Sequence, residues 1–188
     1  IEDAGLVVSG PDGSAVLPAD RVAVVVGRRP NSDMVGLVEA GANVDEGGLV
    51  VVDPARRATE TVFAIGDLTP GPALAHKATA EAEAAADVAC GRANAFDPTC
   101  IPLIVFSDPQ VVVVGMTKAD ASSAGIAATS SRFPLAASGR ARTLGTGDGF
   151  VTVVADGDGT VIGVQAVGAH VAELAGEAAL AVETAATV

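Results

Sequence analysis

Short apolar runs separated by polar turns characterise the first half of the chain. Residues 21–27 (RVAVVVG) form an unbroken apolar run that is rich in valine and ends at Gly27. A run without polar alternation is typical of a strand that is buried on both faces of a sheet. Residues 48–53 (GLVVVD) and 61–67 (TVFAIGD) show a similar pattern. The pattern predicts three buried strands here, with weaker strands around a Gly-Pro-Asp-Gly turn near the start of the chain.

Helical patterns lie between and after these runs. Asp33 can cap a short helix over residues 33–41, which Gly41 can end in a left-handed conformation. Residues 73–90 are rich in alanine and predict a long helix, because Pro72 is tolerated at a first helical turn. Buried strands alternating with helices indicate an α/β unit.

The second half has a different pattern. Composition changes over residues 91–102, which we interpret as the boundary between two units. Beyond it, residues 103–115 predict two strands broken by an Asp-Pro pair, and residues 126–134 predict a third. Residues 149–168 predict a hairpin with an Asp-Gly-Asp-Gly turn. This unit is expected to be α+β, with an antiparallel sheet that carries helices.

Two helices are predicted within that second unit. Thr117 can cap a short helix that Gly125 ends. The final segment, residues 170–187, has the spacing of an amphipathic helix. Its apolar stripe consists of Val171, Leu174, Ala178 and Val182. We expect this stripe to pack against the sheet.

Charge and hydropathy exclude several classes of partner. The chain of 188 residues has 11 basic and 23 acidic residues, a net charge of −12. Such an anion is a poor ligand for nucleic acids or anionic membranes. The acidic excess is compatible with a salt-adapted proteome and with a GC-rich genome. No apolar run is long enough to span a bilayer and no secretion signal is visible, so we expect a cytoplasmic protein.

Cysteine and histidine residues show no metal-binding pattern. Cys90 and Cys100 are separated by nine residues, unlike a C-x-x-C pair, and are expected to be reduced structural thiols. His76 and His170 have no Cys, His or acidic partner at metal-ligand spacing, so no metal site is expected. His170 precedes the last helix, where a surface or capping role is favoured.

The candidate site is the junction between residues 61–67 and the alanine-rich helix. Gly66 at a strand end lets the backbone approach a ligand, and the Asp67 carboxylate can accept hydrogen bonds from sugar-like hydroxyls. The following helix begins near Ala73 with free N–H groups and a positive dipole end. The alternative is an ordinary strand–turn–helix joint with a solvated aspartate.

Other stretches that suggest ligand sites have simpler interpretations. Residues 145–149 (GTGDG) lead into a strand rather than a helix and fail as a dinucleotide fingerprint. Residues 156–160 (DGDGT) begin like a calcium loop, but strands flank them on both sides, so a hairpin turn is expected. The arginines are too sparse for a phosphate patch and are interpreted as solvated surface: Arg56, Arg57, Arg140 and Arg142.

Five segments in order carry a family resemblance: VGRRPN, TVFAIGD, LAHKA, FPLAASGRA and AELAGEAALAVE. Together they resemble the C-terminal half of the FAD-dependent pyridine nucleotide-disulfide oxidoreductases, and PGPALAHKA is most similar to the dihydrolipoamide dehydrogenase branch. The resemblance implies a partial FAD/NAD-binding sandwich followed by a dimerisation domain. It divides the chain into the end of an NAD-binding domain (1–27), a returning FAD-binding segment (28–95) and a dimerisation domain (96–188).

The resemblance also assigns cofactor contacts. Asp67, preceded by Gly66, is similar to the residue that binds the ribityl chain of FAD, and Gly27 to a backbone contact of NAD. The helix start resembles the segment beneath the pyrimidine edge of the flavin: Ala73, Leu74, Ala75 and His76. The implied partners are a second copy of the chain and a 2-oxoacid dehydrogenase complex. Departures from the family pattern are Thr79-Ala80, where acids are commoner, and residues 107–110 (SDPQ).

Several family features are absent from the 188 residues. The sequence has no G-x-G-x-x-G fingerprint, no C-x-x-x-x-C redox pair and no His-Pro pair after the last helix. We therefore expect no catalytic residue in the chain, which is interpreted as an inactive portion truncated at both ends. The implied reaction of the whole enzyme is dihydrolipoamide plus NAD⁺ to lipoamide plus NADH. Open alternatives are a mercuric or glutathione-type reductase of the same family, and a non-catalytic dimerisation or scaffold module.

Overall fold

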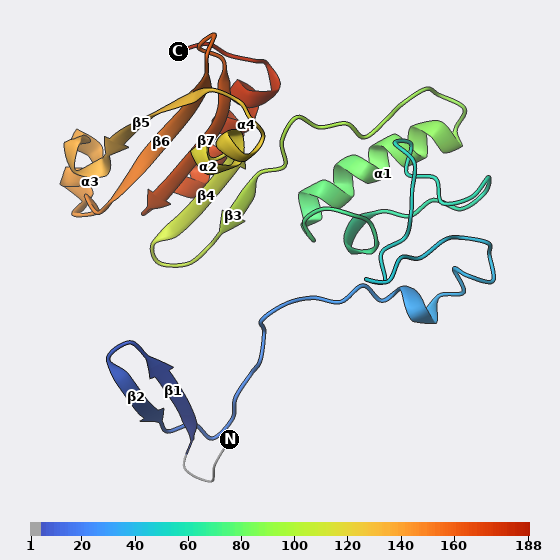
Figure 1. Cartoon of the computed structure of the whole chain (residues 1–188), viewed down its shortest axis with the longest axis horizontal. Helices are drawn as coiled ribbons and strands as arrows, with labels where there is room; N and C mark the ends of the chain where they lie inside the picture. The colour runs from blue at the N-terminus through green and yellow to red at the C-terminus, as the bar shows by residue number, and fades with distance from the viewer. Residues whose placement is uncertain (1–4) are drawn as a thin grey trace.

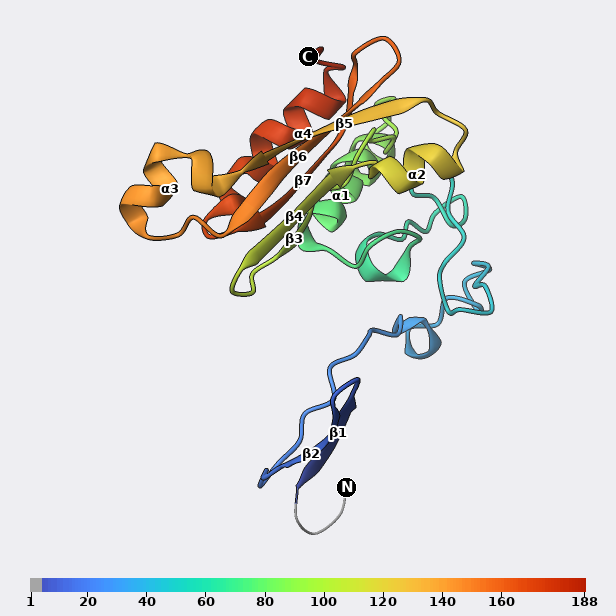
Figure 2. The ribbon, with the colours of Figure 1, turned by 60° about the vertical axis from the view of Figure 1, so that its left-hand side comes forward.

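The computed structural model describes residues 5–188, and its elements fall into three parts along the chain (Figure 1). Strands β1 (Leu6–Gly10) and β2 (Gly13–Leu17) form an antiparallel hairpin at the start, as the turn residues predict. Figures 1 and 2 show this hairpin apart from the other elements, joined to them by an extended segment. A middle part contains α1 (Ala75–Ala89), and a sheet follows.

The prediction of a strand over residues 21–27 is wrong, because the structure has no strand there. No described segment pairs with these residues, and Val24, Val25 and Val26 are 75%, 88% and 94% exposed. An apolar run identifies side chains that favour burial, but a strand also needs a neighbour to satisfy its N–H and C=O groups. Within residues 5–188 that neighbour is missing, so the run is extended and open to solvent.

The middle part buries its apolar runs without forming a sheet. Residues 48–53 and 61–67 were expected to be strands, but each contributes only an isolated bridge, Val44 with Val50 and Arg57 with Phe63. The burial itself follows the prediction, since a small core forms from Leu37, Ala42, Val50 and Ala64. These segments pair too briefly to count as strands.

The short helix expected over residues 33–41 is also corrected. Only a single 3₁₀ turn, η1 (Ser32–Met34), forms, and Asn31 rather than Asp33 precedes it. Turns continue to Gly41, which has the left-handed φ of 83° expected for a terminating glycine. The alanine-rich helix α1 is confirmed, beginning two residues after the predicted start at 73 and ending one before the predicted end at 90.

The second half forms the expected antiparallel sheet, in the order β3-β4-β7-β6-β5. The strands predicted on either side of the Asp-Pro pair are β3 (Leu103–Val105) and β4 (Gln110–Gly115). The predicted strand before residue 134 is β5 (Ala128–Pro134). The predicted hairpin is β6 (Gly149–Asp156) with β7 (Val161–Gly168). The strand pattern of this half is confirmed.

Short helices connect the strands. Thr117 caps α2 (Lys118–Ser123) in a reciprocal capping box with Asp120, as its position predicts. Two elements were not predicted, η3 (Leu135–Ala137) and α3 (Gly139–Leu144), although Ser138 caps α3 and Gly145 ends it. Those two residues are the usual signals of a helix start and stop, and they could have identified α3.

The sheet and the last helix share one core. A 3₁₀ turn, η4 (Val171–Leu174), leads into α4 (Ala175–Glu183), which lies along one face of the sheet (Figure 2). The buried members of this core are Val112, Val114, Val161, Val164, Ala166, Val171, Ala175, Ala178 and Val182. Leu174, predicted in the apolar stripe, is instead 36% exposed. The 3₁₀ turn has a different period from an α-helix, so Ala175 takes the buried position.

None of the helices among residues 5–188 has the length and apolarity needed to cross a membrane.

Candidate functional site

The Gly66–Asp67 turn is the structural centre of the candidate site. Gly66 begins the 3₁₀ turn η2 (Gly66–Leu68) with a left-handed φ of 73°. A Cβ at Gly66 would lie 3.3 Å from the Cβ of Ala78 in α1, so the turn packs closely against the helix. Both the backbone angle and this close approach favour glycine. The Gly-Asp pair thus fixes Asp67 at the surface beside α1.

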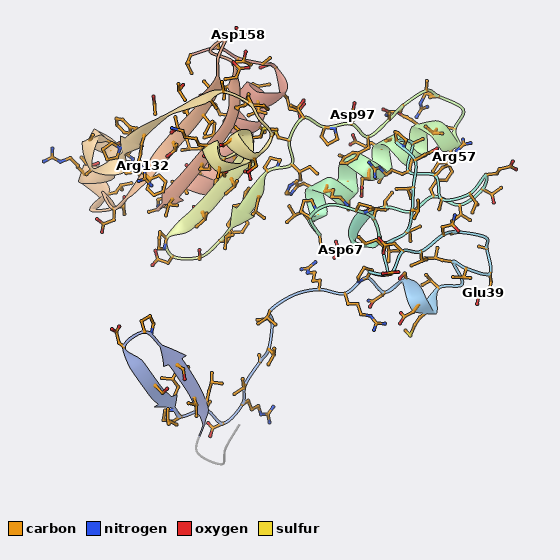
Figure 3. All side chains as sticks on the ribbon, in the orientation of Figure 1. Glu39, Arg57, Asp67, Asp97, Arg132 and Asp158 are labelled. Atoms are coloured by element: carbon orange, nitrogen blue, oxygen red, sulfur yellow. The ribbon has the colours of Figure 1, made fainter. Side chains whose placement is uncertain are left out.

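Asp67 is exposed and has an ionic partner. Its side chain is 48% exposed, and its Oδ2 lies 2.8 Å from Nη1 of Arg28, which is 70% exposed. Figure 3 shows the Asp67 side chain at the edge of its loop, toward the segment that leads from the hairpin. Arg28 was not predicted to be a neighbour of Asp67. A carboxylate with half its surface open can accept further hydrogen bonds from a ligand.

Helix α1 begins without a cap beside this turn. Leu74 is its N-cap residue, no side chain accepts a hydrogen bond from the first turn, and the first turn contains no acidic residue. Ala73 and Leu74 are half-buried, whereas Ala75 and His76 are exposed. The first N–H groups of a helix have no intrahelical partner and form the positive end of its dipole. This helix start can therefore receive an acceptor atom or a developing negative charge.

The side chain of His76 is engaged elsewhere. Its Nε2 lies 2.9 Å from the carbonyl oxygen of Pro102, in the segment before β3. Because a carbonyl only accepts, this hydrogen bond requires a proton on Nε2. His76 thereby links the start of α1 to the second half of the chain, and only its backbone N–H faces the helix terminus.

A buried ionic cluster that was not predicted from the sequence lies beneath the turn. Lys77 and Glu81, one turn apart on α1, are 2% and 0% exposed, and Thr69 is 1% exposed. Nζ of Lys77 lies 3.1 Å from Oε1 of Glu81. We refer to Thr69, Lys77 and Glu81 as the buried cluster. Charged residues are seldom fully buried unless they are paired. Lys77 and Glu81 are four positions apart on an alanine-rich helix, and this spacing could have indicated an ion pair.

Arg56 also contacts the buried cluster, through Glu81. Its Nη1 lies 3.4 Å from Oε1 of Glu81, and its guanidinium stacks 4.4 Å from the ring centroid of Phe96. The Arg56 side chain is only 13% exposed, which corrects the expectation of a solvated residue. Arg57 is also half-buried, over the ring of Phe63. The expectation holds for the remaining pair, Arg140 and Arg142, which are exposed.

The remaining candidate residues lie outside this site. Gly27 is exposed and a Cβ there would meet no atom within 4 Å, but Arg28, the next residue, reaches Asp67. His170 is on the surface, with Nδ1 3.8 Å from Oε1 of Glu173. Among residues 5–188, no group of three or more His, Cys, Asp or Glu side chains is arranged to hold a metal ion.

The two cysteines are free and in different environments. Cys90, at the end of α1, is exposed, contrary to the expectation of a structural thiol. Cys100 is half-buried, and its N–H donates to Oε1 of Glu183 at 3.1 Å. Burial, followed by the nearby Glu183 carboxylate, raises the pKa of the Cys100 thiol to about 11. Cys100 is therefore a neutral thiol near neutral pH, unsuited to attack a disulfide.

Two family matches cover most of the chain. Residues 101–188 match the pyridine nucleotide-disulphide oxidoreductase dimerisation domain. Residues 1–82 match the pyridine nucleotide-disulphide oxidoreductase domain. The first match covers the five-stranded sheet and α4, and the second includes the Gly66–Asp67 turn and the start of α1.

Curated relatives show the same relationship in sequence. A dihydrolipoyl dehydrogenase of Geobacillus stearothermophilus is 44% identical over 169 residues, which cover 89% of this chain and 36% of the relative. A dihydrolipoyl dehydrogenase of Halobacterium salinarum is 43% identical over 190 residues, covering 98% of this chain and 40% of the relative. The chain thus spans about two fifths of the length of the curated relatives it matches.

Solved structures share the fold. LpdA from Mycobacterium tuberculosis superposes with a TM-score of 0.83 at 27% identity, covering 98% of this chain and 40% of that one. The HOCl-induced flavoprotein disulfide reductase RclA from Escherichia coli superposes with a TM-score of 0.83 at 23% identity, covering 97% of this chain and 42% of that one. At this lower identity the second likeness concerns the fold alone.

Proposed function

Because the chain belongs to the pyridine nucleotide-disulphide oxidoreductase family, we propose that it forms part of a flavin-dependent dihydrolipoyl dehydrogenase. The complete enzyme oxidises dihydrolipoamide to lipoamide and reduces NAD⁺ to NADH. One observation carries the proposal. The half-exposed Asp67 carboxylate stands on a glycine turn that packs against α1, beside a helix start without a cap.

The groups at this junction fit FAD. The Asp67 carboxylate is an acceptor for the hydroxyls of the ribityl chain, and Gly66 allows a ligand to approach the backbone. The uncapped start of α1 offers N–H groups and a positive dipole end to the pyrimidine edge of the flavin. The residues in these roles are Gly66, Asp67, Ala73, Leu74, Ala75 and His76.

When bound, FAD would supply the electron carrier between the substrate dithiol and NAD⁺. The residues of this chain would bind and orient it. Hydrogen bonds from the α1 terminus favour negative charge at the pyrimidine edge of the ring, so they would stabilise the flavin once it is reduced. His76 would contribute through its backbone N–H, because its side chain is held by Pro102. We assign no proton transfer to His76.

NAD would contact the chain at Gly27. This residue is exposed, and a Cβ there would meet no atom within 4 Å, so the backbone is open to a ligand. We propose the division 1–27 for the end of the NAD-binding domain, 28–95 for the returning FAD-binding segment and 96–188 for the dimerisation domain. Such a division assigns Gly27 to NAD and the Gly66–Asp67 turn to FAD.

The catalytic groups are assigned to parts of the enzyme that the 188 residues do not include. The sequence contains no C-x-x-x-x-C pair and no G-x-G-x-x-G fingerprint, and Cys100 is held as a neutral thiol. Disulfide exchange needs a thiolate and a nearby base for the proton of the substrate. We therefore propose that this chain supplies cofactor contacts and a subunit interface, and no catalytic residue.

We further propose that the enzyme is a cytoplasmic homodimer that operates in a 2-oxoacid dehydrogenase complex. The match of residues 101–188 to a dimerisation domain supports the dimer. Large apolar side chains exposed in this part could become buried in such an interface: Phe106, Phe133, Leu144 and Leu180. Sedimentation of the purified protein tests the dimer, and a monomer at high micromolar concentration contradicts it.

The function is tested on the protein expressed from its complete coding sequence. We expect it to retain FAD through gel filtration and to reduce NAD⁺ with dihydrolipoamide. Turnover with mercuric ion or oxidised glutathione but not with the lipoamide couple would favour another reductase of the family. A dimer without flavin and without any turnover would favour a scaffold module.

A further inference from the structure

We propose that Glu81 and Lys77 are positioning residues, which hold the Gly66–Asp67 turn in the conformation that presents Asp67 to the flavin. The inference deepens the proposed function and rests on it. Neither side chain can touch a ligand at the surface, because both are at least 98% buried. Their role would be exerted through the backbone of Gly66 and through Thr69.

The Glu81 carboxylate is surrounded by donors. Its Oε2 accepts the backbone N–H of Gly66 at 2.6 Å. Its Oε1 accepts the Thr69 hydroxyl at 2.9 Å and lies 3.1 Å from Nζ of Lys77. Arg56 approaches the same oxygen at 3.4 Å. Four groups from three segments of the chain thus converge on one side chain, which leaves it no freedom to reorient.

The buried cluster holds both sides of Gly66. While Glu81 accepts the N–H of Gly66, Nζ of Lys77 donates to its carbonyl oxygen at 3.0 Å. The hydroxyl of Thr69 approaches the same carbonyl oxygen at 2.9 Å. The peptide groups before and after Gly66 are therefore both held by hydrogen bonds. These bonds maintain the left-handed φ of 73° at Gly66. Because Asp67 follows directly, the direction of its side chain depends on these two peptide groups.

The same side chains join the turn to the helix start. Lys77 lies in the first turn of α1 and Glu81 one turn later, and both bind the backbone of Gly66, so the first two turns of the helix are linked to the Gly66–Asp67 turn. The two features assigned to flavin binding are the Asp67 carboxylate and the uncapped N–H groups of α1. Their separation is set by the buried cluster, and misplacement by about 1 Å at such sites can weaken function strongly.

Stability alone does not account for a buried ion pair here. Replacing a buried pair with apolar side chains of similar volume is often neutral or stabilising, because desolvation offsets the mutual attraction. Removing one partner leaves an uncompensated charge and destabilises the protein. The pair at Lys77 and Glu81 is instead suited to fixing one geometry, since each partner also binds the backbone of the functional turn.

The test uses the flavin-loaded protein from its complete coding sequence and the double variant Lys77→Met/Glu81→Gln. This variant removes both charges of the Lys77–Glu81 pair with little change in volume, and Arg56 keeps its hydrogen bond to the carbonyl oxygen of Phe96 and its stacking on the Phe96 ring. We expect a folded protein whose flavin dissociation constant rises by about tenfold or more. The flavin absorption bands and reduction potential should also shift, because the ring environment changes. Glu83→Gln, an exposed position on the same helix, is the matched control and should change none of these.

A second control separates positioning from loss of stability. Ala84 is buried in α1 and is not a member of the buried cluster, so Ala84→Gly should lower the thermal midpoint while leaving the flavin spectrum and potential unchanged. In the 188-residue chain, hydrogen exchange at the Gly66 amide should be faster in the double variant and unchanged in Glu83→Gln. If the unmodified protein takes up no flavin, the proposed function fails and this inference with it. If it takes up flavin and the folded double variant binds with an affinity within about twofold, only this inference is overturned.

Discussion

Nη1 of Arg28 lies 2.8 Å from Oδ2 of Asp67, which joins the loop after the valine run to the turn before α1. Both side chains are well exposed, 70% and 48% respectively. Surface pairs of this kind contribute only about 0–1 kcal/mol. The pair therefore adds little stability, and it competes only weakly with a ligand that donates hydrogen bonds to the Asp67 carboxylate.

Substitution of Asp67 by Ala should weaken flavin binding in the protein from its complete coding sequence. A hydrogen bond to a charged acceptor contributes about 1.5–3 kcal/mol, so the dissociation constant should rise by about one to two orders of magnitude. Flavin fluorescence during dialysis measures this constant. Asp158→Ala, in the exposed turn between β6 and β7, is the control. Unchanged flavin content in Asp67→Ala after gel filtration would contradict the assignment.

Cys100 should react slowly with alkylating agents. The rise of its pKa from 9.0 to about 11 lowers the thiolate fraction near pH 8 by about 100-fold, and the thiolate is the reactive form. Mass spectrometry after brief iodoacetamide treatment should find Cys90, which is exposed, labelled well before Cys100. Equal labelling of both cysteines in the folded chain would contradict the environment described for Cys100.

The raised pKa of Cys100 also makes the stability of the folded chain depend on pH, with stability falling at high pH. A raised pKa means that the folded state favours the neutral thiol, so this stabilisation is complete below pH 9.0 and is lost as the pH rises toward about 11. Urea unfolding across this range measures the loss, and Cys100→Ser, compared at the same pH values, should reduce it. A loss of equal size in the variant would assign it to other groups.

The valine run over residues 21–27 is exposed in the 188-residue chain, and a substitution can test whether the complete protein buries it. Because Val25 is 88% exposed, Val25→Asp should change the free energy of unfolding of the 188-residue chain by no more than about 0.5 kcal/mol. In the protein from its complete coding sequence we expect this run to be a buried strand, where the same charge should be strongly destabilising. Thermal unfolding of both forms, with Val25→Thr as the conservative control, measures the difference. Equal tolerance in both forms would contradict the expected strand.

The sequence predicted the second half of the chain well because its strands pair locally. Residues 149–168 contain both strands of a hairpin and its turn, so the pattern and the partner occur together. The capping box of Thr117 with Asp120 is equally local. In contrast, residues 21–27 show the composition of a buried strand but have no pairing segment within residues 5–188. Composition can indicate a strand, but it cannot supply the neighbour.

For the candidate site, sequence reasoning identified the turn but not its support. Gly66, Asp67 and the helix start follow from a strand-end glycine, an acid and a proline-rich loop, and the structure brings them together. The buried cluster was missed because charged side chains such as Lys77 and Glu81 are seldom fully buried, and nothing in the sequence marks these two as buried. Their burial depends on Thr69 and Arg56, which contact them from distant positions in the chain.

The 188-residue chain alone should have no dihydrolipoyl dehydrogenase activity. It contains no redox cysteine pair, and hydride transfer requires NAD to be held against the flavin, which contact at Gly27 alone cannot achieve. Dihydrolipoamide, NAD⁺ and added FAD should give no turnover above a blank without protein. Turnover by a preparation cleared of host enzyme would contradict the assignment of the catalytic groups to other parts of the enzyme.

The most direct test of the central claim is anaerobic spectroscopy of the protein from its complete coding sequence. We predict that the purified protein carries FAD, that dihydrolipoamide reduces it and that NAD⁺ then restores the oxidised spectrum. The double variant and Asp67→Ala should lose flavin, whereas Glu83→Gln should behave as the unmodified protein. A folded protein that carries no flavin, or flavin that dihydrolipoamide cannot reduce, would contradict the account.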